Sequence, residues 1–182
     1  MGREEKSIYL TFDDGPIPYL TDWVLDQLNQ YKIKATFFCV GANILKNHTI
    51  FERIKSEGHT VGNHTMFHSK GFKNTVGSYL KEVEECKKLV HTNLFRPPYG
   101  QLRRGQYRAL MEGGYKIILW DVISYDFENI SEKTCADNVI KNTKNGSIVL
   151  FHDNMKAERN MKYALPLFLE EYTKRGYTFK TL

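Results

Sequence analysis

Apolar positions follow two different spacings, which alternate along the chain. Short runs rich in β-branched and aromatic residues predict strands, and apolar residues at every third or fourth position predict amphipathic helices. The strand runs cover residues 7–10, 35–40, 59–63, 94–95, 116–120, 147–151 and 177–180. The helical spacing covers residues 19–31, 44–57, 79–90, 102–112, 131–144 and 163–175, the last bent or begun near Pro166.

Strands and helices alternate from one end of the chain to the other. This order predicts an α/β fold, with a parallel sheet joined by helical crossovers. About seven such units favour a small or incomplete barrel over an open sheet. A chain of 182 residues is long enough for one buried domain and short for two. With no repeat or linker in it, we expect a single domain over residues 1–182.

Polar residues gather where the predicted strands end. In an α/β barrel the carboxyl ends of all strands meet on one face, where active sites are built. Each cluster alone has a structural explanation, such as a solvated turn or an arginine that anchors its loop. The clusters are Asp13 and Asp14 after the first strand, His64 and His68 after the third, Arg96 after the fourth, Asp126 after the fifth, and His152 with Asp153 after the sixth.

A metal site is one reading of these clusters. His64 and His68 are four residues apart, so on a helical turn their imidazoles would face the same way and share one ion. Asp14 adds a carboxylate, which completes the ligand set of catalytic zinc sites and leaves a position open for water. Cobalt, nickel or iron could take the same ligands, so zinc is a preference.

The remaining polar residues suggest acid and base chemistry. Neighbouring strand residues point to opposite faces, so Asp13 and Asp14 are expected to differ in role unless the chain twists there. Asp13 is placed as a general base for water at the metal, and Arg96 could hold it ionised. His152 suits a general acid, although a hydrogen-bonded structural histidine is the competing explanation.

Composition limits which partners, metal sites and locations we expect for this protein. The net charge is +5 with lysines spread along the chain and no aromatic-basic motif, so we expect no nucleic-acid partner. The three cysteines are too far apart for a thiolate zinc site or a disulfide framework. No apolar run approaches the roughly 20 residues of a membrane span. The first six residues do not resemble a signal peptide. The protein is therefore expected in the cytoplasm, or in the periplasm or at the cell surface if a leader was removed.

Four stretches closely resemble the ordered motifs of one family. They are TFDDGP at 11–16, HTMFH at 64–68, RPPYG at 96–100 and LFHD at 150–153. The chain resembles the polysaccharide deacetylases, the NodB-like group of carbohydrate esterase family 4. The resemblance implies a distorted (β/α)7 barrel and metal-dependent removal of acetyl groups from sugars.

The resemblance also implies a role for each motif residue. Asp13 would be the base, oriented by Arg96, and His152 the acid, supported by Asp126. The residues that would hold the metal are Asp14, His64 and His68. The Tyr99 backbone amide would bind the oxyanion and Leu150 would line the pocket for the acetate methyl. The other residues assigned to the substrate site are Pro97, Trp120 and Phe127.

One motif departs from the family. Members often read Asp-x-x-Asp-Trp after the fifth strand, whereas this chain has Ile123 and Phe127 at the first and last of those positions and keeps Asp126. The chemistry should survive this change, but the substrate preference is put in doubt.

The leading hypothesis is a monomeric hydrolase that deacetylates N-acetylglucosamine units in an acetylated glycan, either peptidoglycan or a chitin-like oligosaccharide. An O-acetyl esterase on acetylated xylan would use the same residues. An inactive carbohydrate-binding protein is the alternative from another class.

Overall fold

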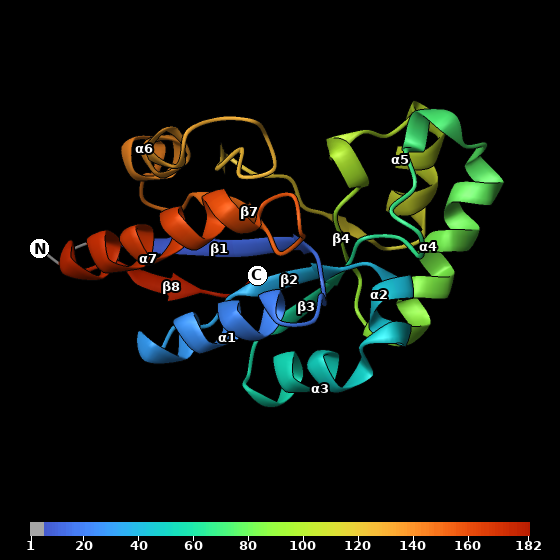
Figure 1. Ribbon diagram of the computed structural model, residues 1–182. Coiled ribbons are helices and arrows are strands. Elements are labelled where there is room, and N and C mark those ends of the chain that lie inside the picture. The colour runs from blue at the N-terminus through green and yellow to red at the C-terminus, as the bar shows by residue number, and fades with distance from the viewer. Residues whose placement is uncertain (1–5) are drawn as a thin grey trace, which may run out of the picture.

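A parallel sheet forms the centre of the computed structural model, which describes residues 6–182 (Figure 1). Residues 1–5, part of the segment compared with a signal peptide, lie outside the described residues. The strands are β1 (Ser7–Asp14), β2 (Thr36–Cys39), β3 (Thr60–Asn63), β4 (Leu94–Phe95), β5 (Lys116–Ile117), β6 (Val122–Ile123), β7 (Ile148–His152) and β8 (Thr178–Lys180). Their order across the sheet is β5-β4-β3-β2-β1-β7-β6, and β8 pairs with the start of β1.

The expected distorted barrel is confirmed, in an incomplete form. Strands β5 and β6 stand at the two ends of the strand order, and no pairing joins them within residues 6–182. The sheet is therefore a curled half-barrel of parallel strands. Its central strand, β1, lies between β2 and β7, and the pairing sets Asp13 beside Phe38 on one side and His152 on the other.

Helices cover the outside of this sheet (Figure 1). They are α1 (Leu20–Gln30), α2 (Gly41–Lys46), α3 (His48–Ser56), α4 (Val76–Val90), α5 (Arg104–Glu112), α6 (Glu132–Asn142) and α7 (Glu158–Lys174), with short 3-10 turns η1 (Gly71–Lys73) and η2 (Pro98–Gly100). None of the described helices is both long and apolar enough to cross a membrane.

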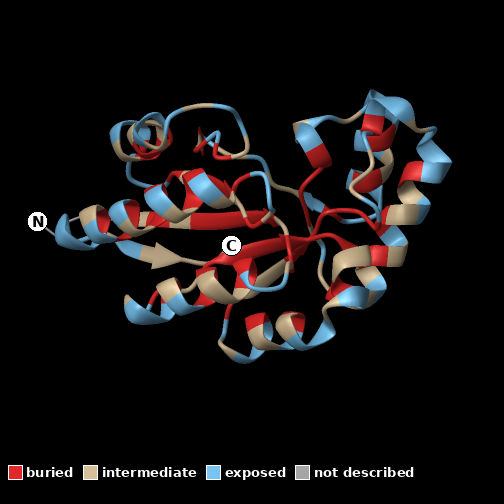
Figure 2. Ribbon diagram, in the orientation of Figure 1, coloured by how far each residue is buried: buried red, intermediate tan, exposed pale blue. Residues whose placement is uncertain are grey.

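Aromatic packing holds the sheet against the helices. The ring of Phe12 on β1 stacks on Phe37 of β2 at 5.0 Å and lies 6.1 Å from Phe151 of β7. Phe168 of α7 packs on Phe151 from outside. Burying each such ring stabilises the fold by roughly 2–3 kcal/mol. Figure 2 shows the buried residues along the strands and on the inner helix faces, so the strand that carries Asp13 lies within the core.

Two predicted elements differ from the structure. The helix expected over 44–57 divides into α2 and α3, because Asn47 leaves the helical conformation (φ −130°, ψ 48°). Its side-chain amide donates to the Pro16 carbonyl at 3.0 Å, a bond that competes with a continuous helix. The strand expected over 116–120 stops at Ile117, and the next carbonyls accept hydrogen bonds from Arg96.

Further boundaries were misplaced, among them those of β6 and α7. Residues expected to form a loop provide the short strand β6, which pairs with β7. Helix α7 begins at Glu158, five residues before the expected start, and runs through Pro166 to Lys174.

Candidate active site

The first motif turns both of its carboxylates into one cavity. Asp13 is the penultimate residue of β1, and Asp14 follows in a left-handed backbone conformation with φ 90°. This twist removes the alternation expected of neighbouring strand residues, and both side chains line the same cavity. The Asn43 amide donates to the Asp14 carbonyl at 2.8 Å and holds the turn.

Gly15 closes that turn against the end of β7. Its N–H donates to Asp153 Oδ1 at 2.9 Å, and a Cβ at this position would lie 1.9 Å from Asp153 Oδ2. Thr21 donates to the same Oδ2 at 2.5 Å. Burial raises the pKa of the Asp153 carboxyl to about 8, against the opposing effect of these two donors. Asp153 therefore belongs to the framework that supports the first motif.

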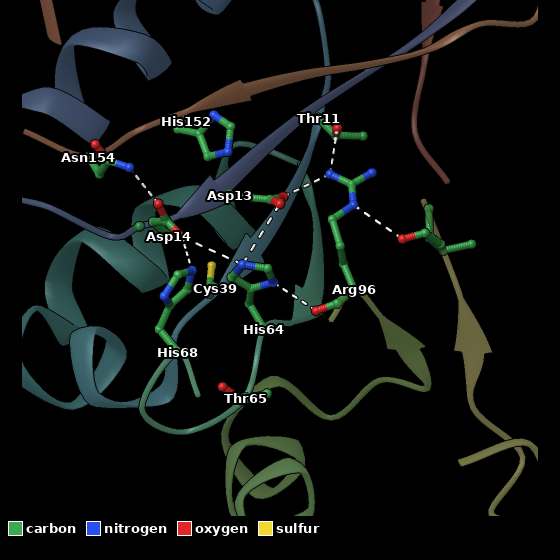
Figure 3. A network of polar contacts seen from close by, with 12 residues as sticks. Thr11, Asp13, Asp14, Cys39, His64, Thr65, His68, Arg96, His152 and Asn154 are labelled. Atoms are coloured by element: carbon green, nitrogen blue, oxygen red, sulfur yellow. Dashed lines mark hydrogen bonds and ion pairs between the residues drawn. The ribbon is translucent and has the colours of Figure 1, made fainter. Parts of the chain in front are cut away.

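Asp14 faces the two histidines of the second motif (Figure 3). Its Oδ1 lies 3.0 Å from His68 Nε2 and 3.5 Å from His64 Nε2. One potential ligand atom from each of the three residues falls within 4.8 Å of the others. Burial opposes ionisation of Asp14, but the nearby imidazoles of His64 and His68 outweigh it and hold the pKa of its carboxyl well below its usual range.

These residues fit a divalent metal ion. Asp14 Oδ1 is buried and has no hydrogen-bond partner among residues 6–182. His64 Nδ1 lies 2.7 Å from the Arg96 carbonyl, so this nitrogen carries the proton and Nε2 is left as a metal-ligating atom. A buried acceptor beside two imidazole nitrogens is the arrangement that a cation would satisfy.

The helical turn expected at 64–68 is absent. The segment is a loop in which Thr65 (φ 63°) and His68 (φ 56°) have left-handed backbones. The Thr65 N–H donates to Asn63 Oδ1 at 2.9 Å, and the Ser69 N–H donates to Thr65 Oγ1 at 3.2 Å. Side-chain hydrogen bonds of this kind favour loops over helices. The imidazoles converge all the same, because the loop folds back toward β1.

Arg96 is fully buried and pairs with Asp13. Its Nη1 donates to Asp13 Oδ1 at 2.7 Å and to Thr11 Oγ1 at 2.8 Å. Its Nε and Nη2 donate to the carbonyls of Ile118 and Leu119. A buried charge needs this degree of satisfaction. The guanidinium thereby fixes the orientation of the Asp13 carboxylate.

Asp126 and His152 form the second charged pair. Asp126 is fully buried, its Oδ1 lies 2.8 Å from His152 Nδ1, and its Oδ2 accepts the His152 backbone N–H at 2.8 Å. Burial lowers the affinity of the imidazole for a proton, but the charge and hydrogen bond of Asp126 exceed that effect. Together with the carboxylates of Asp13 and Asp14 they raise the pKa of His152 to about 9.

A cavity of about 490 Å³ connects these groups. Its volume falls in the range of small-molecule sites. Of the residues assigned to substrate, three line the cavity, namely Tyr99, Trp120 and Phe127. Leu150 and Pro97 are buried and are not among its lining residues, so their contact with substrate stays a prediction. The full lining is Asp13, Asp14, His64, His68, Tyr99, Trp120, Ile123, Phe127, His152, Asn154, Met155 and Lys156.

Sequence reasoning missed the last three lining residues. Asn154, Met155 and Lys156 follow directly after the motif that ends in Asp153, and none of them carries a recognisable pattern. Their position after a strand end was the available signal, since loops after parallel strands line the active-site face of a barrel.

Known proteins resemble this chain in sequence and in fold. A family model described as polysaccharide deacetylase matches residues 1–118. A peptidoglycan-N-acetylglucosamine deacetylase of Bacillus cereus is 36% identical over 187 residues, covering 99% of this chain and 88% of the relative.

Two solved structures extend the likeness. A peptidoglycan N-acetylglucosamine deacetylase in complex with a substituted benzamide has a TM-score of 0.93 and 31% identity, covering 98% of this chain and 86% of its own. The Xyl-CE4 domain of a multidomain xylanase, from the hindgut metagenome of Trinervitermes trinervoides, has a TM-score of 0.85 and 31% identity, covering 98% and 88%.

These similarities place the chain among hydrolases that act on carbohydrates. It belongs to the polysaccharide deacetylase family, which confirms the resemblance found in the four motifs.

Proposed function

We propose that this chain removes N-acetyl groups from N-acetylglucosamine units of a glycan, with peptidoglycan as the preferred substrate. One observation carries the proposal: the Asp14, His64 and His68 ligand atoms converge between the Asp13–Arg96 and His152–Asp126 pairs. The Bacillus cereus relative supports the choice of peptidoglycan.

Asp14, His64 and His68 would hold the metal, with zinc preferred and cobalt or nickel as alternatives. When bound there, the ion supplies Lewis acidity, which polarises the acetyl carbonyl and lowers the pKa of water. Imidazole and carboxylate ligands suit zinc.

Asp13 takes the proton of the attacking water. Its Oδ1 is engaged by Arg96, while Oδ2 lies 3.8 Å from His64 Nε2, on the side of the ligand atoms. One carboxylate oxygen is thus fixed, and the other faces the reacting groups. The free oxygen Oδ2 is therefore the one placed to accept the proton of water.

His152 gives its proton to the departing nitrogen. The water oxygen bonds to the acetyl carbon, the carbon–nitrogen bond breaks, and acetate leaves beside a free amine. With a pKa of about 9, His152 is protonated at neutral pH and ready to act as the acid. The Tyr99 backbone amide would stabilise the oxyanion, and the rings of Trp120 and Phe127 would contact the sugar.

The O-acetyl esterase remains a second candidate, because the similar xylanase domain suggests it and the same residues would serve. Ile123 and Phe127 line the cavity, so their departure from the family pattern falls where substrate is chosen. An inactive glycan-binding protein is disfavoured, since each proposed acid, base and ligand is present. We further propose that residues 1–182 act as one monomeric catalytic domain.

Acetate release from peptidoglycan, chitooligosaccharides and acetylxylan, measured side by side with added zinc, tests the proposal. We expect the highest turnover on peptidoglycan. Turnover on acetylxylan alone would replace the proposal with the esterase, and binding of all three without turnover would replace it with the inactive binding protein.

A further inference from the structure

The side chain of Asn154 contacts the carboxylate that faces the two histidines. It extends from the segment after β7, and its Nδ2 lies 2.5 Å from Asp14 Oδ2 (Figure 3). Neither the four motifs nor the acid and base pairs include this residue.

The amide of Asn154 has a fixed orientation. Its Oδ1 accepts the backbone N–H groups of Lys156 at 2.9 Å and Ala157 at 3.0 Å. Flipping the amide would give up both bonds and set an oxygen against the Asp14 carboxylate. The atom that meets Asp14 is therefore the nitrogen, which can only donate.

This bond gives the two carboxylate oxygens of Asp14 different roles. Oδ2 accepts from Asn154, whereas Oδ1 faces the Nε2 atoms of His64 and His68 without any hydrogen-bond donor of its own in the described part of the chain. A carboxylate without such a contact can rotate about its last bond. Asn43 donates to the Asp14 backbone carbonyl, whereas Asn154 is the one residue among 6–182 that donates a hydrogen bond to the carboxylate itself.

We infer that Asn154 is a positioning residue, which holds Asp14 with one oxygen directed to the metal and so raises the metal affinity of the site. The inference rests on the ligand set given under the proposed function. Hydrogen-bond partners of metal ligands typically contribute about 10–100-fold to metal affinity.

Two substitutions separate this role from a merely structural one. In Asn154→Ser the hydroxyl can still accept the N–H groups at positions 156 and 157, but it is too short to reach Asp14. Asn154→Ala loses both sets of contacts. A turn-forming role predicts that only the alanine variant is impaired, whereas positioning of Asp14 predicts that both bind metal more weakly.

The measurement is a competition titration of zinc against a chromophoric chelator, with thermal unfolding of the metal-free proteins recorded in parallel. We expect both variants to bind zinc about 10–100-fold more weakly than the wild type, while Asn154→Ser keeps its unfolding temperature. Asn142→Ser is the matched control, because within residues 6–182 that exposed amide donates only to the Asn138 carbonyl on α6.

Zinc affinity of Asn154→Ser within about twofold of wild type would overturn the inference. His68→Ala tests the ligand set in the same titration. If His68→Ala also binds like wild type, the proposed metal site is wrong and the inference falls with it. If only His68→Ala binds weakly, the site stands and Asn154 has no positioning role.

Discussion

Arg96 Nη1 lies 2.7 Å from Asp13 Oδ1, and their side chains are 0% and 4% exposed. Removing one member of such a buried pair leaves the other charge buried and without a partner. We therefore expect Arg96→Met to lower the free energy of unfolding by roughly 3–5 kcal/mol, and Arg96→Lys to lower it less. Urea unfolding of the metal-free proteins measures this, with the exposed Arg108→Lys on α5 as the control. A wild-type midpoint for Arg96→Met would contradict the assignment.

The Asp126–His152 pair predicts a pH effect. A general acid must be protonated, so activity should fall as the pH rises through the His152 pKa of about 9. In Asp126→Asn the imidazole loses the negative charge that raises its pKa. We expect slower turnover and an alkaline limb of the kcat/KM profile displaced to lower pH, with metal content unchanged. Loss of the metal instead would mean that Asp126 is a ligand.

His59 predicts a pH dependence of stability away from the active site. It is buried, and its Nδ1 accepts the Ala35 N–H at 3.1 Å. Burial, aided by the charge of Lys34, lowers its pKa to about 4. The folded state thus favours neutral His59, and the unfolded state takes up a proton below its ordinary pKa of about 6.5.

This stabilisation is fully present above pH 6.5 and is lost as the pH falls toward 4. Between pH 7 and pH 5 the loss should be roughly 1–2 kcal/mol. Urea unfolding of wild type and His59→Gln at both pH values isolates the contribution of His59 to the free energy of unfolding. Equal pH sensitivity of the two proteins would show that His59 is not the responsible group.

Removal of the metal should abolish acetate release reversibly. A chelator would inactivate the enzyme, and added zinc or cobalt would restore it, because Asp14, His64 and His68 remain in place. His68→Ala should be inactive even with added zinc while its thermal unfolding stays close to wild type. Full activity of the chelated protein would contradict metal dependence.

The sequence could predict the position of the chemistry because it depends on strand ends. Asp13, Arg96 and His152 each follow an apolar run that becomes β1, β4 or β7, and parallel pairing brings such ends to one face. The half-barrel followed from the same alternation of strands and helices.

Other features depend on contacts between distant residues, which no local pattern reveals. Strand β5 ends early because Arg96 donates hydrogen bonds to the carbonyl groups that follow it. Helix α2 ends where the Asn47 side chain donates to the Pro16 carbonyl. The His64–His68 loop was mistaken for a helical turn because spacing alone ignores the bond from Thr65 to Asn63.

Asp13 and Asp14 are adjacent, yet we expect them to have different roles. Asp14 faces His64 and His68, whereas Asp13 is held by Arg96 and would accept the proton of water. Asn in place of Asp keeps the size of the side chain and removes its negative charge. Asp13→Asn should therefore retain metal, and Asp14→Asn should lose it.

The most direct measurement is acetate release from peptidoglycan beside metal content for Asp13→Asn and Asp14→Asn. Loss of a general base costs roughly 10²–10⁴ in rate. We expect the turnover of Asp13→Asn to fall at least that far with its metal content intact, and Asp14→Asn to lose both metal and activity. Turnover of Asp13→Asn at the wild-type rate would show that Asp13 is not the base and would place the base elsewhere.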